Sequence, residues 1–273
     1  MSARAAAFFD LDGTLLPLPS LERRFFRILR HRCEIPLTNY FSWCGEALKL
    51  LPRGIGHVLH ANKMVLRGVH SFVEEGPGKQ VDTCAHVSGH PLQLRASEGE
   101  GRPSTPPKHL PRWLVPHFFE DGVERVAWHA MRGHAIVIVS GTLEPLANAA
   151  ARALELELAA RGVATEISVC ATKLEESEGK WTGRILGEPL FGKAKAHAIH
   201  MLAKGMSLEL SRSWAYGDSA ADRWMLASVG NPAAVNPTPK LVRIARKEGW
   251  PALRTTDRLQ QTKQTRQPVE RCA

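Results

Sequence analysis

Three short apolar runs, each ending in a polar turn that contains glycine, constrain the fold of this 273-residue chain most strongly. The first run, residues 5–9, ends at Asp10. The second, residues 135–139, ends at Ser140, and the third, residues 214–216, ends at Gly217. Stretches with helical patterns precede or follow these runs, over 122–132, 144–160, 193–204 and 220–228. Strands that alternate with helices predict an α/β fold with a doubly wound parallel sheet, in which ligand sites gather at the carboxyl ends of the strands.

The residues between the first two runs have a different pattern. Segment 20–31 places apolar side chains on one helical face, and segments 40–51 and 57–74 also look helical. We therefore predict an inserted helical cap over 17–121 with a flexible loop at about 75–111. The core would comprise 1–16 and 122–254, followed by a polar tail over 255–273. Residues 229–237 are expected to form a further strand and turn.

Two carboxylates at the end of the first run suggest phosphoryl chemistry. Asp10 and Asp12 stand two residues apart where the chain leaves the strand, and Gly13 permits a tight turn there. One carboxylate can attack phosphorus while the other transfers protons. Since two carboxylates repel a phosphate group, a divalent cation is expected beside them. Asp218 supplies a further acid for that cation, and Asp222 would support the site.

The turn after the second run and the start of the helical stretch over 193–204 supply groups that bind an anion. Ser140 offers a hydroxyl group, Gly141 a backbone N–H, and Lys193 a positive charge for both the phosphoryl oxygens and Asp10.

In this order, the four segments resemble the motifs of the haloacid dehalogenase superfamily, subfamily IB, which is phosphoserine-phosphatase-like. The segments are 8–15, 138–142, 192–195 and 217–222. The resemblance implies a Mg²⁺-dependent phosphatase on a Rossmann-like core. Asp10 would be nucleophile and metal ligand, and Asp12 general acid/base with its backbone carbonyl on the metal. Ser140, Gly141 and Lys193 would bind phosphate, Asp218 would bind the metal, and Asp222, Gly13 and Thr14 would support the site.

The substrate is left open by the cap sequence. Phosphoserine phosphatases carry a cap glutamate nine positions after the nucleophile, where this chain has Pro19, and Ser20 and Glu22 are out of register. The expected substrate is a small phosphorylated metabolite, phosphoserine-like or another. The alternatives are a lipid phosphate, or transfer of the phosphoryl group to an acceptor other than water.

Composition and charge limit the binding partners and the cellular location expected for this chain. A formal net charge of +9 comes from scattered Lys and Arg, and no basic run interleaved with aromatic residues predicts nucleic-acid binding. Five widely spaced cysteines and the absence of a signal-peptide pattern predict a reduced, cytoplasmic protein. No apolar run is long enough to span a membrane, although a peripheral contact of the cap with lipid is left open.

Overall fold

The computed structural model describes residues 4–71 and 116–255. Its main sheet has six parallel strands in the order β3-β2-β1-β6-β7-β8. The strands are β1 (Ala6–Phe9), β2 (Ala135–Leu143), β3 (Ile167–Thr172), β6 (Trp214–Gly217), β7 (Asn231–Val235) and β8 (Ala252–Leu253). Because β1 lies at the centre and the chain adds strands on both sides of it, the predicted doubly wound α/β fold is confirmed.

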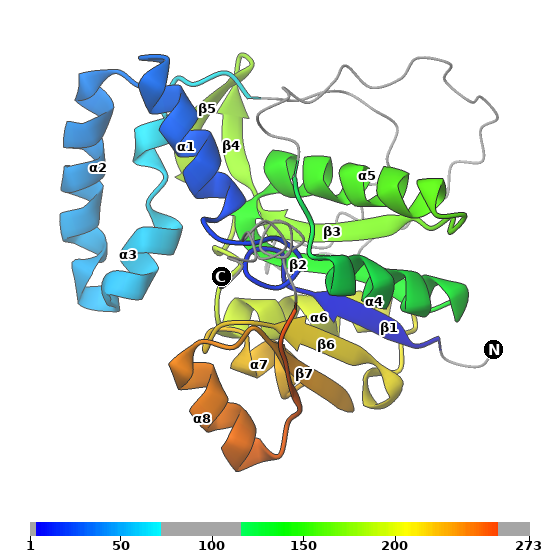
Figure 1. Ribbon diagram of the computed structural model, residues 1–273. Coiled ribbons are helices and arrows are strands. Elements are labelled where there is room, and N and C mark those ends of the chain that lie inside the picture. Colours follow the sequence, from blue (N-terminus) through cyan, green and yellow to red (C-terminus); the bar gives the residue numbers. More distant parts are fainter. Residues whose placement is uncertain (1–3, 72–115, 256–273) are drawn as a thin grey trace, which may run out of the picture.

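Helices cover both faces of this sheet (Figure 1). One face packs against α4 (Glu120–Met131) and α5 (Glu144–Ala160). The other packs against α6 (Lys193–Gly205), α7 (Arg223–Leu226) and α8 (Pro239–Glu248). Strand β1 shows the alternation that this arrangement requires, since Ala7 and Phe9 join the first core while Ala6 and Phe8 join the second. All four side chains of β1 are apolar and buried, as expected for a strand that is covered on both faces of the sheet.

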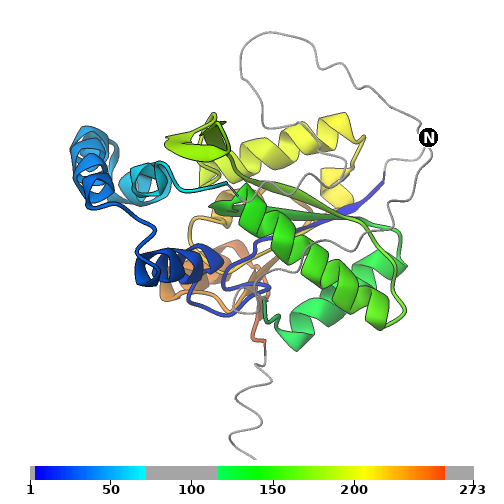
Figure 2. The same ribbon diagram turned by 90° about the horizontal axis from the view of Figure 1, so that it is seen from above.

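A helical cap follows β1 and projects beyond the sheet (Figures 1 and 2). It contains α1 (Leu21–His31), α2 (Leu37–Leu50), α3 (Ile55–Ala61) and two 3₁₀ turns, η1 (Leu51–Arg53) and η2 (Met64–Leu66). The single helix expected over 57–74 was wrong: α3 ends at Ala61, because Asn62 adopts an extended backbone conformation. The side-chain amide of Asn62 donates instead to the Trp43 carbonyl at 2.8 Å, which ties α3 to α2.

A hairpin from the core side of the sequence joins this cap. Strands β4 (Leu174–Ser177) and β5 (Lys180–Ile185) pair antiparallel. The backbone N–H of Trp181 donates to the Val69 carbonyl at 2.9 Å, and the Trp181 ring meets Phe25 of α1 edge-on. The sequence analysis did not predict this hairpin. The expected loop at 75–111, and all but the first residue of the tail over 255–273, lie outside the described residues.

Candidate active site

The carboxyl ends of β1, β2 and β6 bring the predicted polar turns together. Asp10 directly follows β1, Ser140 and Gly141 lie near the end of β2, and Asp218 follows β6. The backbone N–H of Asp10 donates to the Tyr216 carbonyl of the neighbouring strand at 2.9 Å, so Asp10 continues the sheet register. The expected edge site is therefore present as a cluster of side chains.

Three aspartates form the acidic centre. Asp10, Asp218 and Asp222 each offer a carboxylate oxygen, and these oxygens lie within 4.8 Å of one another. All three side chains are buried. Such a set of hard oxygen donors fits a divalent cation such as Mg²⁺. Asp222, which the sequence analysis gave a supporting role, is a full member of this cluster.

Close packing against aspartate side chains explains two glycines of the cluster. Gly13 has φ of +91°, and a Cβ there would lie 2.4 Å from Asp218 Oδ2. At Gly217, a Cβ would lie 2.6 Å from the Cβ of Asp222. Both contacts are shorter than atoms tolerate, so only glycine leaves room for the side chains of Asp218 and Asp222.

The positive charge beside Asp10 belongs to Lys195. From the sequence, Lys193 was expected to supply it. The Lys195 ammonium donates to Asp10 Oδ1 at 2.5 Å and to Asp222 Oδ1 at 2.6 Å. Lys193 instead places its amine 5.1 Å from the centre of the Trp224 ring. Lys195 lies on the buried face of α6 with Ala198, Ile199 and Leu202, while Lys193 is the first residue of that helix.

A pattern in the sequence could have identified Lys195 as the buried lysine. Residues 195, 198, 199 and 202 follow the spacing of a single helix face, and the other three are apolar. A lysine on an apolar face is buried only when paired, so the helical pattern favoured Lys195.

Burial and charge raise the pKa values of two aspartates. Burial raises the pKa of Asp10 well above its ordinary range; Lys195 opposes this shift, and Asp222 and Asp218 add to it. Burial, with repulsion from Asp222, raises the pKa of Asp218 to about 7. Burial alone would lower the pKa of Lys195, but Asp10 and Asp222 outweigh it and raise that pKa. Three carboxylates against one ammonium leave negative charge that a bound divalent cation would offset.

Asp12 lies outside the acidic cluster in its side-chain contacts. Its Oδ1 accepts from the backbone N–H of Leu21 at 2.7 Å, and its Oδ2 accepts from Thr142 Oγ1 at 2.6 Å. The Thr142 N–H in turn donates to Ser140 Oγ at 3.2 Å. The sequence analysis did not single out Thr142, although it belongs to the same Ser-Gly-Thr turn. The metal contact expected for Asp12 involved its backbone carbonyl, and it stays a prediction.

The cap reaches this site at Gly141. A Cβ at Gly141 would lie 3.3 Å from the Leu190 carbonyl and 3.8 Å from Nδ1 of His60 in α3. The His60 ring stacks on Phe191, with ring centres 3.8 Å apart. His60 is thus a cap residue beside the predicted phosphate-binding turn, and it was not among the site residues predicted from the sequence.

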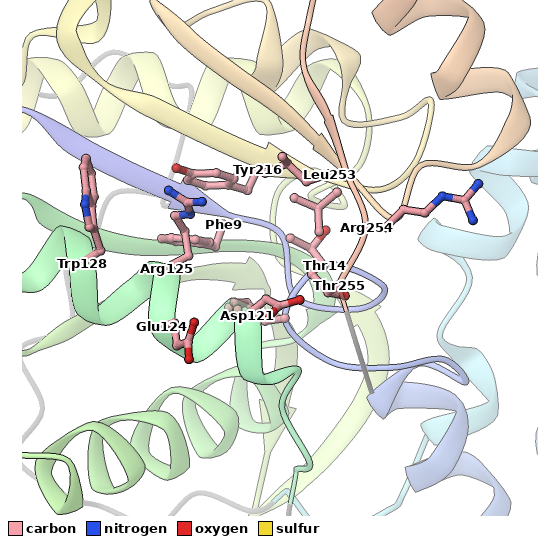
Figure 3. Close-up of a pocket in the computed structure, with 13 residues that line it drawn as sticks. Phe9, Thr14, Asp121, Glu124, Arg125, Trp128, Tyr216, Leu253, Arg254 and Thr255 are labelled. Carbon is pink, nitrogen blue, oxygen red and sulfur yellow. The ribbon is translucent and has the colours of Figure 1, made fainter. Parts of the chain in front are cut away.

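Thr14 lines a separate cavity of about 350 Å³ between β1, α4 and the end of the described chain, together with Arg125, Tyr216 and Arg254 (Figure 3). Its buried hydroxyl has no hydrogen-bond partner among the described residues. None of the three clustered aspartates lines this cavity. The supporting role expected for Thr14 stays a prediction.

Comparison with known proteins places this geometry among hydrolases. A model of the haloacid dehalogenase-like hydrolase family matches residues 92–227. A phosphoserine phosphatase of Mycobacterium tuberculosis is 31% identical over 90% of this chain and 69% of its own length. A probable phosphatase of the same organism is 34% identical over 92% of this chain and 75% of its own. A protein of unknown function from Bordetella pertussis Tohama I superposes with a TM-score of 0.59 at 25% identity, covering 92% and 99%.

Proposed function

This chain belongs to the haloacid dehalogenase-like hydrolases and is an enzyme of their phosphatase class, and from that premise we propose that it is a Mg²⁺-dependent phosphomonoesterase acting through an aspartyl phosphate on Asp10. The observation that carries the proposal is the buried cluster in which Lys195 bridges Asp10 and Asp222 beside Asp218.

The donor set fits a divalent metal ion. Asp10, Asp218 and Asp222 would hold it through carboxylate oxygens, which are the ligands that Mg²⁺ prefers. When bound, the ion would polarise the phosphoryl oxygens and offset the charge of the approaching substrate. Lys195 alone offsets only part of the negative charge of three aspartates.

In the first half-reaction, a carboxylate oxygen of Asp10 attacks phosphorus and the bond from phosphorus to the ester oxygen breaks. Lys195 holds Asp10 by a 2.5 Å hydrogen bond and supplies positive charge to the phosphoryl oxygens. Asp12, in its protonated form, gives its proton to the departing oxygen. The alcohol product then leaves.

In the second half-reaction, water attacks the aspartyl phosphate and Asp12 takes a proton from that water. Inorganic phosphate is released and the Asp10 carboxylate is restored. The Ser140 hydroxyl and the Gly141 N–H would bind the phosphoryl oxygens throughout, since both lie near the end of β2 and Thr142 joins Ser140 to Asp12 by hydrogen bonds.

The proposed substrate is a small phosphorylated metabolite. Pro19 stands where phosphoserine phosphatases carry their amine-binding glutamate, and Glu22 pairs with the buried Lys63. His60 lies beside Gly141 in the cap, and its ring would contact the bound ester or its leaving group. The cytoplasmic location expected from the sequence is kept with this proposal.

The test is phosphate release from an aryl phosphate with Mg²⁺, compared with Asp10→Asn. We expect the variant to lose turnover by at least about 1,000-fold, because an amide is a far weaker nucleophile. Acid-quenched parent enzyme should carry phosphate on Asp10 by peptide mass spectrometry. Glu188→Gln, at an exposed acid, is the matched control and should retain full activity. Turnover by Asp10→Asn equal to that of the parent would contradict the mechanism.

A further inference from the structure

The cap exposes a ridge of large apolar side chains. Seven of the ten large apolar side chains that stand exposed among residues 4–71 and 116–255 lie within residues 18–59. Six of the seven belong to α2, η1 and α3 and form the ridge: Leu37, Phe41, Leu48, Leu51, Ile55 and Leu59. Phe41 and Leu37 are each 77% exposed, and Leu48 is 72% exposed.

The ridge follows one line along α2. Leu37, Phe41, Leu48 and Leu51, with the exposed Cys44 between them, are spaced by four, three, four and three residues. On an α-helix this spacing confines the side chains to a strip of about 80°. The opposite side of α2 faces the protein through Asn39, whose side-chain amide donates to the carbonyls of Val65 and Arg67. The half-buried Trp43 and Leu50 lie on the same side of α2 as Asn39, so the exposed strip is an additional apolar side of this helix.

The arrangement of the cap makes the ridge accessible. Helix α2 lies at the outer edge of the molecule, with α3 between it and the core (Figures 1 and 2). The ridge is therefore a projecting edge, which suits a broad surface better than it suits a peptide.

Charge distinguishes among the surfaces that could cover the ridge. Residues 17–71 hold nine Lys or Arg and three acidic residues, so this segment carries a net charge of +6 out of +9 for the whole chain. Arg23, Arg27 and Arg30 form an exposed line along α1, the helix that leads into α2. A second copy of the chain would bring two such basic caps together in a two-fold dimer, and their charges would repel. An anionic lipid surface complements both the apolar ridge and the basic residues.

We propose that the α2–η1–α3 ridge docks the protein on the surface of an anionic phospholipid bilayer. The apolar side chains insert among the lipid acyl chains, and the α1 arginines bind the phosphate headgroups. The helices lie on the bilayer: no helix in the described part of the chain has the length and hydropathy of a membrane span. This inference concerns a surface outside the acidic cluster and does not depend on the proposed reaction.

The test is cosedimentation of the full chain with vesicles of phosphatidylglycerol and, separately, of phosphatidylcholine. We expect binding to phosphatidylglycerol, an affinity for phosphatidylcholine lower by about tenfold or more, and loss of binding as salt rises. The double variant Phe41→Ser/Leu48→Ser should weaken binding to phosphatidylglycerol by about tenfold or more. Arg23→Gln/Arg27→Gln/Arg30→Gln should remove the preference for the anionic lipid.

Met131→Ser/Leu156→Ser is the matched control. It removes two apolar side chains that are 68% and 67% exposed on α4 and α5, and it should bind vesicles as the parent does. Circular dichroism of each variant checks that it is folded. The proposal fails if the parent does not sediment with phosphatidylglycerol, or if folded Phe41→Ser/Leu48→Ser binds as well as the parent. It also fails if light scattering shows a dimer that this variant dissociates, without vesicle binding by either form.

Discussion

The carboxylate of Asp12 accepts a hydrogen bond at 2.7 Å from the backbone N–H of Leu21, the first residue of α1. An acid at the end of β1 therefore binds the N-terminus of the first cap helix. The helix dipole and the free N–H groups of that first turn favour a negative charge there. Movement of α1 would change the environment of the proposed proton donor, so the position of the cap and the chemistry of Asp12 are linked.

Removal of the other hydrogen bond to Asp12 tests this arrangement. Thr142→Val keeps the side-chain shape but removes the hydroxyl that donates to Asp12 Oδ2 at 2.6 Å. We expect kcat to fall by about tenfold, because the carboxyl group loses the contact that orients it. Thr142→Ser retains a hydroxyl and should stay within about threefold of the parent. Steady-state kinetics on an aryl phosphate provide the measurement, and equal rates for Val and Ser at this position would show that the contact is unimportant.

Lys195 and Lys193 should differ sharply when each is changed to methionine. Lys195→Met leaves Asp10 and Asp222 buried without their shared cation, and we expect kcat/KM to fall by at least about 100-fold. We also expect a loss of about 3 kcal/mol in the free energy of unfolding. Lys193→Met removes an amine beside the Trp224 ring and should change activity by less than about threefold. Activity assays and urea unfolding measure both effects; a greater loss of activity in Lys193→Met would restore the assignment made from sequence.

The fold and most of the site were predictable because they depend on local patterns. Apolar runs that end in Asp10, Ser140 and Gly217 place these residues at strand ends, and parallel strands share one edge. The hairpin of β4 and β5 was missed, since its short polar strands have only one buried aromatic residue, Trp181, and pair through a turn at Gly179.

Contacts between distant segments were less accessible to sequence reasoning. The pairing of Thr142 with Asp12 spans 130 positions, and no spacing rule gives it. The sequence left a peripheral contact of the cap with lipid open, because periodicity reveals an apolar face but not whether a neighbour covers it. The structure shows Phe41 and Leu48 exposed, which only tertiary arrangement decides.

The apparent affinity for Mg²⁺ should rise with pH. Burial and repulsion from Asp222 raise the pKa of Asp218 to about 7, so protons compete with the metal ion for this carboxylate below that pH. Between pH 6 and pH 8 we expect the affinity to increase by about tenfold or more, since the ionised fraction grows to that extent. Calorimetric titration of the metal-free protein measures both affinity and proton release. Asp218→Asn should bind Mg²⁺ weakly and with a shallower pH dependence than the parent, since Asp10 still titrates; a flat profile for the parent would contradict the prediction.

Acid should destabilise the protein through His129, which is buried on α4. Its Nε2 lies 2.9 Å from the Tyr216 hydroxyl, and its Nδ1 lies 2.8 Å from Nδ1 of His134. Burial, with repulsion from His134, Arg125 and Arg132, lowers the pKa of His129 from 6.5 to about 3. The unfolded chain therefore binds a proton that the folded chain excludes, and stability falls as pH drops from 6.5 towards 3.

At pH 5, the contribution of His129 to this loss is about 2 kcal/mol. His129→Gln lacks the titrating ring, so between pH 7 and pH 5 its unfolding free energy should fall by about 2 kcal/mol less than that of the parent, which gives a shallower slope. His70→Gln, at an exposed histidine, is the control and should keep the parental slope. Urea unfolding at a series of pH values gives the slopes. Identical slopes for His129→Gln and the parent would mean that His129 is already protonated in the folded protein or is not excluded from water.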